Sequence, residues 1–238
     1  MMTIRRVLIS LTLIVAATLS TTAQVARHEI KVGDFNRLTL VDNVNVVYRC
    51  LADSAGLAVV NCTPEELQGL MFSLNSSNRL SLQVEDQLEK RGNLPTVTLY
   101  SSSLEEAEND GDSTLRITHL PPLKSFKARM IDNGKIIVHN VKASKLELQI
   151  LSGKGKIIAS GTCDDLVVKL VGTGEIQADN VQATNVVCRI MGTGRIGCNV
   201  LGGELKVSGS GTGKVYYKGT PSKVTVRKLG TIKAIPME

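Results

Sequence analysis

Short runs of alternating apolar and polar residues fill the C-terminal half of the chain. Leu166, Val168 and Leu170 are apolar and separated by single residues, and the alternation resumes at Ile176 and Ala178 after a small glycine turn. A period of two predicts β-strands, in which one row of side chains points inward and the next outward. This half of the chain therefore consists of short strands joined by tight turns.

The pair of strands recurs about every twenty residues. Each copy centres on a Gly-x-Gly turn, and the second glycine recurs at steps of 19, 20 and 19 residues, at Gly155, Gly174, Gly194 and Gly213. More divergent copies surround Asn133–Ile136 and Leu229–Ile232, which makes about six copies from Leu123 onward. Glycine suits such turns because it adopts a positive φ without steric cost.

Two arrangements fit two strands per copy: a meander of antiparallel hairpins, or a solenoid in which each copy is one coil. In a solenoid, equivalent residues stack about 4.8 Å apart into continuous apolar columns. The repeat offers two such columns, namely Ile157, Ile176, Ile196 and Val215, and Ala159, Ala178, Cys198 and Tyr217. We therefore predict an all-β parallel β-helix with 19–20 residues per coil, with a β-sandwich as the alternative.

The N-terminal half is less regular. Residues 37–48 read as two strands around Asp42-Asn43, resembling one more coil. Thr63 is a suitable cap for a short helix starting at Pro64, and residues 72–74 and 80–84 flank a hairpin turn. Residues 97–100 form a strand, and residues 105–112 are predicted to be a mobile acidic loop. No linker interrupts the chain, so residues 24–238 form one predicted domain, irregular over 24–122 and regular over 123–238.

Residues 1–23 have the pattern of a cleaved signal peptide. Arg5 and Arg6 precede an apolar run over residues 7–19, and the small side chains of Thr21 and Ala23 suit a cleavage site before Gln24. No cysteine near this site offers a lipid anchor. The sequence thus predicts a protein exported to the periplasm or cell surface, without a membrane span after cleavage.

Five cysteines in an exported chain leave at least one unpaired. Cys50 and Cys62 bracket a loop and are the predicted disulfide. Cys188 and Cys198 occupy inward columns on opposite walls of one coil. If the walls stand about 10 Å apart, as packed sheets do, these two thiols are too distant to bond. We therefore predict two buried free thiols.

Charge and composition exclude some partners and cofactors. Removal of the signal peptide lowers the formal net charge from +6 to +4, and the chain has four Tyr, three Phe and no Trp. Few rings are available for base stacking, so no nucleic-acid partner is expected. The three histidines lie far apart in sequence and no CxxC occurs, so neither a metal site nor another cofactor is predicted.

The candidate ligand-facing residues lie at and beside the glycine turns. Thr173, Thr193 and Thr212 would stack into an exposed hydroxyl ladder, and Lys154, Arg195 and Lys214 would place cations beside it. Such a corner suits glycans or an anionic polysaccharide. The alternative is a solvated face whose charges discourage aggregation.

An enzymatic role has less support. Polysaccharide-cleaving β-helix enzymes need converging carboxylates. The carboxylates of the repeats are expected mostly at corners, without converging on one face: Glu147, Asp164, Asp165, Glu175 and Asp179. No catalytic residues are therefore predicted.

The glycine turns, the opening segment Asp34–Leu38 and the closing segment Val215–Pro221 resemble the putative autotransporter adhesin head GIN domain family of exported proteins, common in Gram-negative Bacteroidetes. The resemblance covers about residues 34–235. It implies a right-handed β-helix, an envelope or surface location and no catalytic residues. Lysine or threonine replaces the family's usual turn serine in this chain, so no role for a serine ladder carries over.

These observations predict a non-enzymatic, exported envelope or surface interaction module, adhesin-like or glycan-binding. A purely structural envelope scaffold and a polysaccharide-active enzyme are the alternatives. The partner is an envelope or surface component such as a polysaccharide, and homo-oligomerisation stays open.

Overall fold

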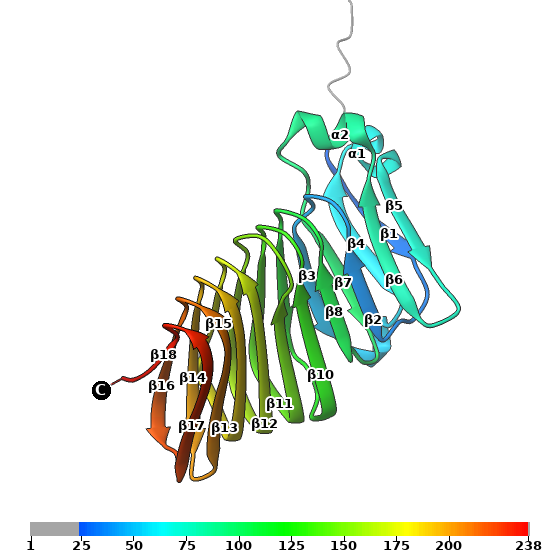
Figure 1. Cartoon of the computed structure of the whole chain (residues 1–238). Helices are drawn as coiled ribbons and strands as arrows, with labels where there is room; N and C mark the ends of the chain where they lie inside the picture. The colour runs from blue at the N-terminus through cyan, green and yellow to red at the C-terminus, as the bar shows by residue number, and fades with distance from the viewer. Residues whose placement is uncertain (1–23, 238) are drawn as a thin grey trace, which may run out of the picture.

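The strands stack into an elongated spiral of coils (Figure 1). The computed structural model describes residues 24–237, and the predicted signal peptide lies outside the described residues. The fold is a β-solenoid of about seven turns with 65% strand and 7% helix, and the β-sandwich alternative is not favoured. The solenoid prediction is confirmed.

Each regular coil has two walls, which we call wall A and wall B. The chain crosses wall A, passes through a Gly-x-Gly turn, crosses wall B, and bends at a second corner into wall A of the next coil. Long strands such as β12 (Lys156–Gly172) continue around this second corner, so that their first half lies on wall B and their second half on wall A.

The strands within each wall pair in parallel. Wall A contains, in stacking order, β6 (Arg79–Val84), β2 (Arg37–Leu40), β8 (Glu106–Asn109), β10 (Leu123–Met130), the second halves of β11 (Lys135–Ile150), β12 and β13 (Glu175–Gly192), then β15 (Glu204–Gly211) and β17 (Lys223–Gly230). Wall B contains β7 (Val97–Ser101), β3 (Val46–Cys50), β9 (Thr114–Thr118), the first halves of β11, β12 and β13, then β14 (Arg195–Leu201), β16 (Lys214–Thr220) and β18 (Lys233–Pro236).

The N-terminal coils do not follow chain order. The coil of β2 and β3 lies between the coil of β6 and β7 and the coil of β8 and β9. The intervening chain forms η1 (Ala52–Ser54), β4 (Leu57–Cys62), α1 (Pro64–Gln68), β5 (Leu70–Leu74) and α2 (Asp86–Arg91). With β1 (Ala26–Lys31), β4 and β5 extend this end of the stack by antiparallel pairing. The predicted extra coil, hairpin and helix are confirmed, and Thr63 caps α1 in a capping box with Glu66.

The predicted acidic loop is wrong in its central part, which is strand β8. Ala107 and Asn109 are fully buried, whereas Glu106 and Glu108 point outward and form ion pairs with Arg129 at 3.4 and 3.2 Å. Alternate residues therefore enter the core as in any solenoid strand. The dense acidic sequence obscured this period-two pattern.

The core is a set of continuous columns. On wall B the predicted column Ile157, Ile176, Ile196 and Val215 stacks in register, with every member 0% exposed. The same column continues toward the N-terminal coils through Ile136, Leu115, Val46 and Val97. Each inward residue is thus covered by its equivalents in the neighbouring coils, which is how a solenoid buries its apolar surface.

Both glycines of each turn are required for close stacking, and the first is also required for its backbone angle. The first has a left-handed backbone, with φ of +106° at Gly172 and +127° at Gly192, and a Cβ at Gly192 would overlap the carbonyl oxygen of Gly172 in the preceding coil. The second lacks a left-handed φ, but a Cβ at Gly174 would lie 2.6 Å from the carbonyl oxygen of Gly155. Only the first therefore needs glycine for its backbone angle as well as for stacking.

The predicted Cys50–Cys62 disulfide is not formed, and both residues are free thiols. Strand β7 lies between them: Cys50 is opposite Ser101 at one end, while Cys62 lies two residues beyond Val60, which is opposite Val97. The two cysteines are therefore roughly 20 Å apart along the strand direction at about 3.3 Å per residue. Closeness in sequence was misleading because β3 and β4 are not adjacent strands.

Cys188 and Cys198 are free thiols and fully buried, as predicted. The neighbouring thiol of Cys198 and burial raise the pKa of Cys188 well above its ordinary value. Cys198 Sγ donates to the backbone carbonyl of Tyr216 at 3.6 Å.

The stacked core predicts a sharp contrast between inward and outward substitutions on β13. Ile176→Asp places an unpaired charge in the fully buried column and should lower the free energy of unfolding by at least about 3 kcal/mol. Gln182→Asp, at an exposed position of the same strand, should change it by within about 0.5 kcal/mol. Urea unfolding followed by circular dichroism measures both, and equal losses would contradict the assigned inward column.

Candidate functional site

The Gly-x-Gly turns stack into one continuous corner between the two walls. The middle residue of each turn is exposed, and its backbone N–H donates to the first turn glycine of the preceding coil, at 3.1 Å for Thr193 and 3.0 Å for Thr212. Thr173 precedes them in the column and Lys154 precedes Thr173. Thr231 extends the column by one coil. The structure thus brings the predicted residues together, although their role in binding stays a prediction.

A second column begins two residues after each turn, on the outer surface of wall B. It consists, in stacking order, of Lys135, Lys156, Glu175, Arg195, Lys214 and Lys233. Glu175 neutralises Lys156 at a distance of 3.0 Å. Within residues 24–237, no carboxylate lies within ion-pairing distance of Arg195, Lys214 or Lys233. We call these last three residues the cation column.

Wall A adds positive charge on the other side of the corner. Lys169, Arg189 and Arg227 share one outward column with Ser208. Lys169, Arg189 and Lys233 were not among the residues predicted from the sequence, because that prediction considered only residues at or directly beside the glycine turns. Counting in steps of one coil from Lys214 would have found Lys233.

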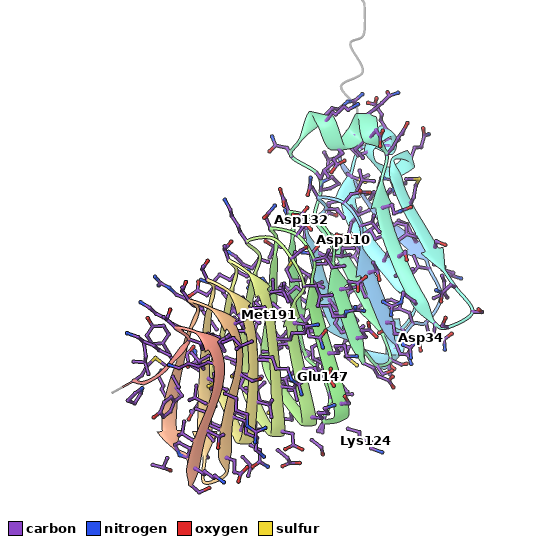
Figure 2. All side chains as sticks on the ribbon, in the orientation of Figure 1. Asp34, Asp110, Lys124, Asp132, Glu147 and Met191 are labelled. Carbon is purple, nitrogen blue, oxygen red and sulfur yellow. The ribbon has the colours of Figure 1, made fainter. Side chains whose placement is uncertain are left out.

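Two surface grooves lie on this face of the solenoid and at its far corner. The larger, about 540 Å³, lies near the second corner, where Arg37, Glu105, Lys124 and Asp164 contribute to its lining. Figure 2 shows Lys124 at that edge, opposite the turn-side edge marked by Asp110 and Asp132. The smaller, about 250 Å³, lies on wall B beside the cation column, and its lining includes Glu175, Gln177, Asp179, Arg195, Gly197 and Tyr216. We call this smaller groove the wall B notch.

The carboxylates of the repeats lie on three different parts of the surface and do not converge on one face. Glu175 and Asp179 line the wall B notch, Asp164 and Asp165 line the larger groove near the second corner, and Glu147 lies on wall A. Glu175 and Asp179 share the notch because outward residues four apart lie on the same face of a strand.

Neighbouring groups fix the two carboxylates of the wall B notch in place, and Glu175 is held in its ionised form. Burial raises the pKa of Glu175, but hydrogen bonds from Lys156 and Gln177 outweigh it, so that the pKa lies below its ordinary value. Asp179 forms an ion pair with Lys218 at 3.1 Å. Each carboxylate of the notch thus acts as a fixed hydrogen-bond acceptor.

Glu147, on the outer surface of wall A, is held in the same way (Figure 2). A hydrogen bond from Lys145 at 2.6 Å lowers its pKa, burial opposes this effect, and Lys127 at 3.7 Å reinforces it. In the part of the chain that the structure describes, no cluster of three or more His, Cys, Asp or Glu side chains is arranged to hold a metal ion.

The family model described as "Putative auto-transporter adhesin, head GIN domain" matches residues 34–221. The chain belongs to this family. No protein of curated function is significantly similar to the sequence. The family match confirms the resemblance found from the glycine turns and the closing Tyr-Lys-Gly-Thr-Pro segment.

Several solved structures share the fold. A putative adhesin from Bacteroides fragilis superposes with a TM-score of 0.80 at 20% identity, covering 90% of this chain and 97% of that one. A putative adhesin from Parabacteroides merdae and a putative lipid binding protein from Parabacteroides distasonis each have a TM-score of 0.71 at 18% identity, covering 91% of this chain and 98% of theirs. At these identities the likeness shows a common solenoid fold and no more.

The Glu147 cluster predicts a pH-dependent contribution to stability. Because the folded-state pKa of Glu147 is lowered, its stabilising effect is present above the unfolded value of about 4.3 and is lost as the pH falls through the folded pKa. Glu147→Gln should therefore cost up to about 1 kcal/mol at pH 7, and this cost should shrink as the pH falls below about 4. Urea unfolding across this range measures the difference. Glu105→Gln is the control, because Glu105 is exposed and forms no ion pair among residues 24–237. An identical pH dependence for both variants would contradict the prediction.

Proposed function

We propose that the protein is a non-enzymatic, exported interaction module of the cell envelope or surface, and that its ligand is an anionic polysaccharide. The observation that carries this proposal is the cation column. Arg195, Lys214 and Lys233 stand on successive coils, about 4.8 Å apart, with no carboxylate paired to them in residues 24–237.

A regular column of like charges suits a polymer better than a small ion. Each coil repels the next through its outward cation, and a repeating polyanion relieves this repulsion at several coils at once. Lys169, Arg189 and Arg227 extend the positive field across the corner. The exposed hydroxyl groups of the Thr column lie between the two sets of cations and can hydrogen-bond to sugar hydroxyls.

The state of the notch carboxylates supports a binding role over hydrolysis. A glycosidase needs one carboxylic acid with a raised pKa to protonate the leaving group. Glu175 has a lowered pKa and is therefore not prepared as an acid. The carboxylate of Asp179 is engaged in an ion pair with Lys218.

Export and surface location are supported by family membership and by the N-terminal sequence. The family description and the adhesin label of two solved relatives both refer to surface proteins. Over residues 24–237 no helix has the length and apolar character needed to cross a bilayer.

Charge reversal in the cation column tests the proposal. The wild-type protein should bind immobilised polygalacturonate at low ionic strength, and Arg195→Glu/Lys214→Glu should bind at least about tenfold more weakly. Binding should also weaken steeply above 0.1 M salt, where the Debye length is about 10 Å.

Lys31→Glu/Arg49→Glu is the matched control, since it makes the same change of net charge at two exposed cations of the N-terminal part. If the two double variants lose the same amount of polygalacturonate binding, the loss is due to net charge and not to the position of the cation column. Absence of binding by the wild type, or binding to anionic lipid vesicles alone, would refute the polysaccharide proposal and favour a scaffold or a lipid-surface role.

Export predicts a processed N-terminus. Protein recovered from its native cells should begin near Gln24, because Thr21 and Ala23 provide the small residues that a signal peptidase requires. N-terminal sequencing measures this directly. Recovery of intact Met1 from the native membrane fraction would mean that the segment is retained and the protein is not released.

A further inference from the structure

The outer surface of wall B has a single gap in one row of side chains. The row runs, in stacking order, through Arg116, Ile137, Ile158, Gln177, Gly197, Tyr216 and Ile235. Gly197 is its only member without a side chain, and Gln177 and Tyr216 stand on either side of it. The wall B notch, about 250 Å³, lies over this gap.

The backbone does not explain why this residue is glycine. Gly197 lacks a left-handed φ, and the nearest atom that a Cβ would meet is Asp179 Oδ1 at 3.3 Å, the end of a side chain. By contrast, a Cβ at Gly194 would overlap the carbonyl oxygen of Gly174. Glycine inside a strand is unfavourable unless something must approach closely. The missing side chain of Gly197 therefore leaves an open space on the outer surface of wall B.

The notch combines a ring with fixed polar groups. Tyr216 supplies an amphipathic aromatic wall. On the opposite side Gln177 donates to Glu175 at 3.0 Å and Lys218 holds Asp179 at 3.1 Å, so both carboxylates present their remaining lone pairs in fixed positions. Arg195 of the cation column also lines the notch, next to Glu175, and forms no ion pair among the described residues.

These groups impose opposite requirements on a ligand. The two carboxylates of the notch repel an anionic group and accept hydrogen bonds from hydroxyls, whereas Arg195 attracts an anion. An apolar ring face suits Tyr216. A ring that carries several hydroxyls and one acidic substituent satisfies all three conditions.

We propose that the wall B notch is a subsite for one acidic sugar ring, of the uronic acid class, within the polysaccharide that the cation column holds. The ring stacks on Tyr216, its hydroxyls donate to Glu175 and Asp179, and its carboxylate meets Arg195. This inference rests on the proposed function and adds to it a preference for sugar rings over polyanions in general.

The test compares a polyanion built of rings with one that has none. Oligogalacturonate and poly-L-glutamate of matched charge are titrated calorimetrically against wild-type protein, Gly197→Val and Tyr216→Ala. Valine is a β-branched residue that suits a strand, so Gly197→Val should fold while filling the notch. Melting temperature checks this for every variant, and Tyr100→Ala, at a half-buried tyrosine on β7, is the matched control.

Wild-type protein should bind oligogalacturonate more tightly than poly-L-glutamate. Gly197→Val and Tyr216→Ala should each weaken oligogalacturonate binding about tenfold and leave poly-L-glutamate binding unchanged. Tyr100→Ala should bind both probes as the wild type does. If both notch variants bind oligogalacturonate as tightly as the wild type, the subsite is excluded, while the cation column and the proposed function stand.

A second measurement separates failure of the subsite from failure of the proposed function. Met237 also lines the notch, so that monomeric galacturonic acid should shift its methyl resonance in wild-type protein and not in Gly197→Val. This shift without binding of either polymer would support a sugar site and refute the polysaccharide module. Absence of both the shift and polymer binding would overturn both proposals.

Discussion

In-register stacking of successive coils is the interaction on which the rest of the structure depends. A single coil cannot bury residues such as Ile176 and Cys188 by itself, because its two walls enclose only one layer of side chains. The equivalent residues of the coils before and after it, including Ile157 and Ile196, cover them on both sides. The backbone hydrogen bonds between coils and the apolar columns therefore form together, and each coil stabilises its neighbours.

The same stacking imposes its register on the outer surface. In places outward charges of opposite sign are neighbours, as where Lys127 lies between Glu106 and Glu147 on adjacent strands of wall A. Toward the C-terminal end of wall B, Glu175 is followed by three successive cations, Arg195, Lys214 and Lys233. Repulsion within such a column lowers stability. Binding of a polyanion at the cation column would offset this loss of stability.

Glycine residues show how closely the coils approach. At Gly174 and Gly194 a side chain would collide with the coil above or below, so that glycine is required for stacking at all. At Gly197 only the Asp179 side chain is near, and the effect of the missing side chain is an open space on the outer surface. The first case concerns the fold, and the second concerns what can approach the surface.

The amino-acid sequence by itself determined the solenoid. The period-two alternation fixes which side chains point inward, and the repeat of 19–20 residues aligns Ile157, Ile176, Ile196 and Val215, because both depend on local geometry that recurs along the chain. Only the tertiary structure decided the order of the N-terminal coils, which makes β8 a strand and separates Cys50 from Cys62 by the length of β7. It also decided the gap at Gly197 between Gln177 and Tyr216. These features arise from contacts between segments far apart in the chain, and no local pattern encodes which segments become neighbours.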